Sequence, residues 1–112
     1  MTVRASVADT DPERRTGLSD RTHLAPDAGM AFLFAGAVRV GFWMKDTQIP
    51  LSIAFWRAEG RIVSIMDMPP CRVDPCPSFR PATPYVGALE VHRGFFERHG
   101  VEVVDRVALA SG

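Results

Sequence analysis

Arg39, Trp43 and Lys45 are spaced by even numbers within residues 38–45, where the apolar side chains occupy the intervening positions. This alternation predicts a half-buried strand with the three side chains on its polar face. Two cations beside an indole can hold an anionic or carbohydrate-like ligand through charge-assisted hydrogen bonds and stacking. The alternative is that Arg39 and Lys45 are simply solvated while Trp43 packs under a loop or a helix, as is usual for amphipathic strands. The face is therefore a candidate binding site with a purely structural alternative.

Glu90 is the fourth candidate residue, because it interrupts an otherwise apolar strand predicted over residues 85–91. A buried carboxylate needs a partner, and an arginine or a lysine is the obvious choice. A structural ion pair is therefore the simpler interpretation, and a ligand-binding or acid–base role is the alternative. An enzyme of the hydrolase type would use Glu90 together with Asp46 or Asp67, converging in a cleft.

Cys71 and Cys76 flank four residues in a proline-rich loop. A disulfide between them would stabilise the fold by roughly 2 kcal/mol in the chain-entropy model, whereas a reducing cytoplasm favours free thiols. The same cysteines could supply two zinc ligands, with His23, His92 or His99 completing the set. No second ligand pair stands at a diagnostic spacing, so we expect no metal. The chain also lacks a glycine-rich phosphate loop, and we expect no cofactor.

Length and charge limit the remaining function classes. The 112 residues suffice for one domain with a single core, and 46% hydrophobic with 23% charged residues is typical of a globular protein. Thirteen basic and thirteen acidic side chains cancel, so nucleic acid and anionic membranes are not expected partners. Arg14, Arg15 and Arg21 could form a local basic cluster. On a short helix they more often make a solvated face paired with acidic neighbours.

The N-terminal residues reach acidic positions quickly and contain no apolar signal core. The most apolar window, residues 28–38, is too short to cross a bilayer. We therefore expect a cytoplasmic protein without a membrane span.

Hydrophobic periodicity and turn residues predict about seven short strands and two short helices, without a strand–helix–strand rhythm or an internal repeat. This pattern predicts a mainly β fold, namely a small, mainly antiparallel β-sandwich or barrel with one or two short helices at its ends. The predicted strands cover residues 2–8, 30–35, 38–45, 51–56, 61–68, 85–91 and 105–110, and the helices cover 12–20 and 92–99.

Pro69–Pro84 contains six prolines and both cysteines, and it is predicted to be a long surface loop without regular structure. Such a loop could present itself to a protein partner. An exposed apolar patch at Phe79 and Tyr85 would favour that interpretation.

The motifs of the chain resemble those of the bacterial and archaeal family DUF192, also called the UPF0127 group. The matching pieces cover nearly the whole chain in the family's order, and FWMKDTQIPLSIAF is the most specific. The resemblance implies a mainly β, jelly-roll-like fold and no reaction, because the family is uncharacterised. The pieces are RRTGLSDR at 14–21, GMAFLF at 29–34, FWMKDTQIPLSIAF at 42–55, GRIVSI at 60–65 and YVGALEVHRGFFERHGVEVVDRV at 85–107.

Three positions depart from the family pattern. Asp46 stands where the family usually has Asn, Ser52 where it usually has Asp, and Val104 where it usually has Gly. If the acid at the position of Ser52 were an essential catalytic group, this chain would be inactive. The departure argues against a family-wide acid–base mechanism that uses this position.

The sequence thus favours a non-enzymatic β-domain that binds a small polar ligand, anionic or carbohydrate-like, through Arg39, Trp43, Lys45 and Glu90. An enzyme using Glu90 and a protein-interaction module using Pro69–Pro84 are the alternatives. Nothing in the sequence indicates an oligomeric state.

Overall fold

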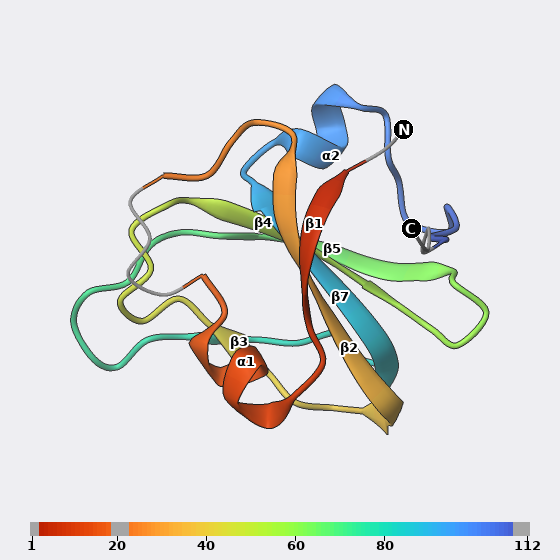
Figure 1. Cartoon of the computed structure of the whole chain (residues 1–112), viewed down its shortest axis with the longest axis horizontal. Helices are drawn as coiled ribbons and strands as arrows, with labels where there is room; N and C mark the ends of the chain where they lie inside the picture. Colours follow the sequence, from red (N-terminus) through yellow and green to blue (C-terminus); the bar gives the residue numbers. More distant parts are fainter. Residues whose placement is uncertain (1–2, 19–22, 109–112) are drawn as a thin grey trace.

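The computed structural model describes residues 3–18 and 23–108 (Figure 1). The mainly β class with two short helices is confirmed. The elements, in chain order, are β1 (Arg4–Ala8), α1 (Asp11–Thr16), β2 (Ala28–Val38), β3 (Phe42–Trp43), β4 (Leu51–Trp56), β5 (Ile62–Met68), β6 (Ser78–Phe79), β7 (Tyr85–His92) and α2 (Phe95–Arg98). No helix in these ranges is long and apolar enough to cross a membrane.

The principal sheet has five strands in the order β1-β2-β7-β4-β5. β1 runs parallel to β2, and every other pair in the sheet is antiparallel. β3 and β6 form a separate antiparallel pair. The predicted mainly antiparallel architecture is therefore confirmed, and the parallel β1–β2 pair makes the sheet mixed. β4 is buried along its whole length, because it lies between β7 and β5 and both of its faces are covered.

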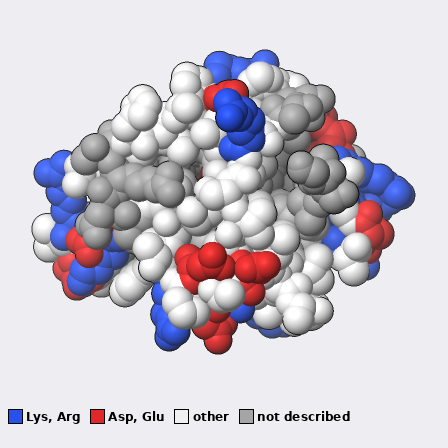
Figure 2. Space-filling view, viewed as in Figure 1, with Lys and Arg blue, Asp and Glu red and all other residues white. Residues whose placement is uncertain are grey.

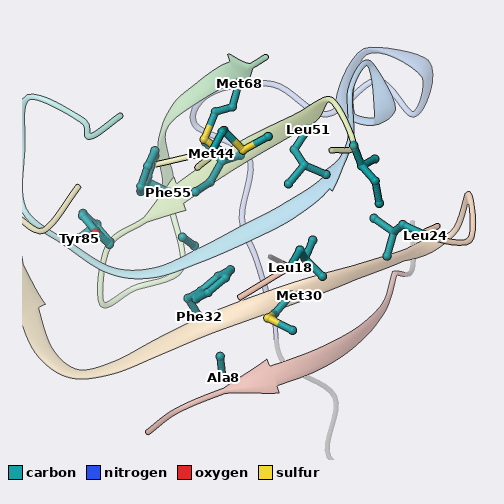
Figure 3. Close-up of a cluster of buried hydrophobic side chains, with 13 residues drawn as sticks. Ala8, Leu18, Leu24, Met30, Phe32, Met44, Leu51, Phe55, Met68 and Tyr85 are labelled. Atoms are coloured by element: carbon teal, nitrogen blue, oxygen red, sulfur yellow. The ribbon is translucent and has the colours of Figure 1, made fainter. Parts of the chain in front are cut away.

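Alternate residues of the central strands supply two hydrophobic clusters on opposite faces of the principal sheet. Phe32, Phe55 and Tyr85 belong to the first cluster (Figure 3). Phe42 and Phe79 of the small sheet pack against this cluster. The second cluster lies on the opposite face and is covered by α2. It contains Ala54, Trp56, Ile62, Val91, Phe95 and Phe96.

The prediction of one continuous strand over residues 38–45 is wrong. β2 ends at Val38, and the chain then leaves the principal sheet before β3 pairs with β6. Gly41 lies so close to β6 that a Cβ atom there would stand 1.9 Å from Ser78 Oγ. Short-range alternation could not reveal this change of partner, because it reports exposure without identifying the neighbouring strand.

Other boundaries also differ from the prediction. β2 spans Ala28–Val38 instead of 30–35, and α2 spans Phe95–Arg98 instead of 92–99. α1 spans Asp11–Thr16 behind a capping box in which Thr10 and Glu13 bond each other's backbone N–H groups, while Asp20 lies outside the described residues. The loop predicted over Pro69–Pro84 contains β6. Of the strand predicted over 105–110, the described part shows one bridge, Arg61 to Arg106.

Val104 adopts a φ of 77°, a left-handed conformation that is costly for a β-branched residue. The glycine that the resemblance implies at this position would avoid this cost. We expect Val104→Gly to stabilise the fold by about 1 kcal/mol, because relief of strain exceeds the added chain entropy of glycine in the unfolded state. Urea denaturation would measure the change. Val103→Gly is the matched control, since Val103 has no positive φ and should gain nothing.

Candidate ligand-binding site

A cavity of about 750 Å³ lies over the first hydrophobic cluster, between α1 and the segment that carries β3. In Figure 1, α1 and β3 lie beside each other at the same end of the molecule. The lining combines aromatic and aliphatic side chains with a few polar groups, which is the usual composition of a small-molecule site. Its lining includes Asp11, Arg14, Arg15, Leu18, Phe32, Phe34, Val38, Val40, Phe42, Trp43, Thr47 and Glu90.

Glu90 lines this cavity from β7, and its residue is only 5% exposed. Its cross-strand neighbours are Met30 and Ile53, both apolar. Among residues 3–18 and 23–108, no hydrogen bond or ion pair engages its carboxyl group, so the predicted ion pair is not found within these ranges. The same residues contain no side-chain oxygen that is both fully enclosed and unpaired, so the carboxyl group faces the open space of the cavity. Burial raises the pKa of Glu90 to about 8. The carboxyl group is therefore mostly protonated at neutral pH and can both donate and accept a hydrogen bond.

Trp43 and Thr47 line the cavity from the segment that begins with β3. The Trp43 residue is 58% exposed, whereas Thr47 is 5% exposed. Phe42, next to Trp43, packs edge-on against Phe32 with ring centroids 4.9 Å apart. The cavity thus offers a solvent-accessible indole near its entrance and a buried hydroxyl group further in.

α1 contributes the charged side chains of the cavity. Arg14 donates hydrogen bonds to the Leu33 carbonyl and to Asp11, both at 2.7 Å, and its guanidinium lies 4.7 Å from the centre of the Phe34 ring. These contacts fix Arg14 in place and neutralise it. Arg15 is exposed and makes no ion pair within the described part of the chain. Figure 2 shows acidic side chains gathered over α1, with basic ones beside them.

The structure brings together Trp43 and Glu90 but not the other two predicted binding residues. Lys45 forms an ion pair with Asp74, and this hydrogen bond raises the pKa of Lys45. Arg39 is exposed and donates to the Ala82 carbonyl at 3.4 Å. Neither side chain lines the cavity.

The carboxylates proposed as catalytic partners of Glu90 lie elsewhere. Asp67 accepts a hydrogen bond from Ser52 at 2.8 Å and stands 3.7 Å from Arg93. Ser52 and Asp67 are on the opposite face of the sheet, because Ser52 alternates with Ile53, the cross-strand partner of Glu90. Asp46 is exposed and does not line the cavity. Glu90 is therefore the one carboxyl group at the inner end of the cavity among the described residues.

Cys71 and Cys76 form a disulfide with an S–S distance of 2.10 Å. The closed loop is attached to the cavity wall, because Cys71 forms backbone bridges with Lys45 and Thr47 and its carbonyl accepts a hydrogen bond from the Asp46 N–H group. β6 follows the loop directly and pairs with β3. The disulfide loop and β6 together support the strand that carries Trp43.

The other predicted candidates do not form a second site. His92 hydrogen-bonds the Leu24 carbonyl, and the His99 ring packs on Phe95. No group of three potential metal ligands occurs among the described residues. Tyr85 is fully buried and Phe79 is half-buried, so they form no exposed patch. Arg21 lies outside the described residues.

Sequence reasoning missed Phe32, Arg14 and Thr47 as lining residues. Phe32 reads as an ordinary core residue, and Arg14 as part of a solvated helix face. The signal that could have found Thr47 is its position inside FWMKDTQIPL, the most specific motif, at a place where a polar side chain is buried.

Two solved structures are similar to this chain. A protein of unknown function from Novosphingobium aromaticivorans DSM 12444 shares 31% identity with a TM-score of 0.88, and the match covers 96% of this chain and 75% of that one. A protein from Sinorhizobium meliloti 1021, described as "a putative transcription regulator", shares 33% identity with a TM-score of 0.80, covering 91% and 78%. Among curated proteins, no sequence matches significantly.

A family model with the description "Uncharacterized ACR, COG1430" matches residues 1–109, which is almost the whole chain. The match agrees with the motif order and with the mainly β fold. The chain belongs to the DUF192 family.

Proposed function

We propose that this domain binds a small polar ligand in the cavity between α1 and β3, and that it is a binding module rather than an enzyme. The observation that carries the proposal is Glu90, a buried carboxyl group lining a cavity of about 750 Å³ without a partner among the described residues. A carboxyl group that faces a cavity from an apolar strand is available to hydrogen-bond water or a ligand there.

The wall chemistry favours a ligand that has an apolar face as well as hydrogen-bonding groups. Trp43 can stack on such a face, as aromatic side chains do with sugar rings and other flat molecules. Thr47 and Glu90 can bond hydroxyl or amino groups. Of the two ligand types expected from the sequence, the carbohydrate-like type fits this lining better than a simple anion, because Arg39 and Lys45 lie outside it.

An enzymatic role has less support, because neither Asp46 nor Asp67 lines the cavity with Glu90. Regulation of transcription by direct contact with nucleic acid is one role that the description of the Sinorhizobium protein suggests. The balanced charge of this chain and the neutralised Arg14 give little support to that role. A cytoplasmic location remains part of the proposal, and the disulfide would then require protection from cellular reductants.

The test is a thermal-shift screen with sugars, organic acids, amines and nucleotides. A ligand at 100 times its dissociation constant stabilises the folded state by roughly 2.7 kcal/mol, which is readily visible in a domain of this size. We expect a shift that disappears in Trp43→Ala and survives in Lys45→Ala, whose side chain lies outside the cavity. Absence of any shift, or a shift that Trp43→Ala leaves unchanged, would contradict the proposal.

A further inference from the structure

We propose that the ligand carries a basic nitrogen, a protonated amine or amidine, which forms an ion pair with Glu90 at the inner end of the cavity. This inference rests on the proposed function and names the ligand class for the same site.

The surroundings of Glu90 are the first reason. Its cross-strand neighbours are Met30 and Ile53, and the cavity walls nearby are built from Phe32 and Phe42. In such surroundings a carboxylate is unfavourable alone but favourable beside a cation that also leaves water. A neutral hydroxyl ligand would engage only the protonated carboxyl group, which forms weaker hydrogen bonds than a charge-assisted pair.

The aromatic walls are the second reason. Phe32, Phe42 and Trp43 line the cavity, and the faces of aromatic rings attract organic cations. The Phe34 ring is already covered by the Arg14 guanidinium. A carboxylate combined with several aromatic rings is complementary to an ammonium group on an apolar body. The Glu90 carboxylate and the aromatic rings offer no favourable contact to an anion at the inner end of the cavity.

The charged groups of the cavity determine the orientation of the bound ligand. α1 contributes Asp11, Arg14 and Arg15, of which Asp11 and Arg14 neutralise each other. The lining residues of β2 and β3 are uncharged. On β7, His92 lies two residues beyond Glu90 on the same face and is bonded to the Leu24 carbonyl. Arg15 therefore repels a cation at the α1 side, so the basic nitrogen points towards Glu90 and a polar or anionic end is directed towards α1.

Binding of an ammonium ion must release a proton. The protonated Glu90 carboxyl group gives its proton to the buffer, and the carboxylate that remains pairs with the ammonium group, so charge and protons balance. Burial raises the pKa of Glu90 to about 8. The affinity for the cation should therefore increase about tenfold for each unit by which the pH is raised, up to a pH of about 8. Affinity for a neutral ligand should fall or stay constant over the same range.

Three probes with one aromatic body test the inference: benzylamine, benzyl alcohol and benzoate. Incorporation of 5-fluorotryptophan gives one ¹⁹F resonance from Trp43 and one from Trp56, which is buried on the opposite face and serves as an internal control. We expect benzylamine to shift the Trp43 resonance with an affinity at least about tenfold higher than that of benzyl alcohol. Calorimetry in two buffers of different ionisation enthalpy should detect proton release with benzylamine only.

Glu90→Gln should lower the benzylamine affinity at least about tenfold and abolish the preference for benzylamine over benzyl alcohol. The proton-release measurement uses the unmodified protein, so the inference stays testable if a variant misfolds. Equal or tighter binding of benzyl alcohol or benzoate would overturn the basic-nitrogen inference while leaving the binding function intact. Failure of all three probes would overturn the inference, and the binding function itself would fail only if the broader ligand screen also gave no shift.

Discussion

Replacement of Glu90 by glutamine should stabilise the empty protein at pH 7 by roughly 3 kcal/mol, an unusual outcome for a buried charged residue. In the unfolded chain the carboxyl group has an ordinary pKa of 4.5 and is ionised at pH 7. In the folded protein, burial raises the pKa of Glu90 to about 8, so folding requires a proton to be taken up. Glutamine has a similar shape and needs no proton, so this cost disappears in Glu90→Gln.

The same residue fixes the sign of the pH dependence. Because the pKa of Glu90 is higher in the folded state, its favourable contribution is complete below pH 4.5 and is lost as the pH rises through 8. We therefore expect the free energy of unfolding to fall by up to about 1.4 kcal/mol per pH unit across that window. Urea denaturation of the unmodified protein at pH 5, 6, 7 and 8 would show this slope, and Glu90→Gln would flatten it.

Glu97→Gln is the matched control, because Glu97 is exposed on α2. It should change neither the stability at pH 7 nor the slope. A structural ion pair at Glu90 gives the opposite result. In that case Glu90→Gln would destabilise the protein, and the stability of the unmodified protein would rise with pH over the acidic range.

The fold was largely predictable because strand alternation and turn residues are local signals. The hairpin between β4 and β5 illustrates this, since Gly60 at a φ of 87° lies where the sequence places the turn. The parallel pairing of β1 with β2 and the pairing of β3 with β6 join segments distant in the sequence. No local pattern identifies which strand becomes the neighbour of another, so these pairings could not be derived from periodicity.

The candidate site was only half predictable for the same reason. Glu90 was identifiable, because a carboxyl group in an apolar strand is anomalous wherever the strand lies. Trp43 was identified because it alternates with Phe42, and in β3 Trp43 is indeed exposed while Phe42 is half-buried. Arg39 and Lys45 were grouped with Trp43 on the assumption of one straight strand, and the departure of the chain from the sheet after Val38 separates them from it. Thr47 and Arg14 reach the cavity because of where the loop after β3 and the helix α1 lie in the fold. Local sequence patterns do not predict these positions.

Reduction of the disulfide between Cys71 and Cys76 should lower both the stability and the ligand affinity of the protein. Opening so short a loop costs about 2 kcal/mol in the chain-entropy model. The loop also supports the cavity wall, because Cys71 bridges to Lys45 and Thr47, and β6 beyond the loop pairs with β3. Trp43 and Thr47 line the cavity from that wall, so a looser wall should hold a ligand less well.

The measurement is the ¹⁹F signal of Trp43 in protein treated with a reductant and in the double variant Cys71→Ser/Cys76→Ser. We expect the Trp43 resonance to broaden and the affinity for any ligand of the cavity to fall by at least about threefold, whereas the Trp56 resonance stays unchanged. Two interactions hold the loop, the Cys71–Cys76 disulfide and the ion pair between Lys45 and Asp74. Asp74→Asn distinguishes their contributions, because it removes the ion pair and leaves the disulfide intact. An exposed ion pair of this kind contributes little, so its loss should have a much smaller effect. An unchanged Trp43 signal after reduction would mean that the β3–β6 pairing alone holds the wall, and the cavity would then be independent of the redox state of the two cysteines.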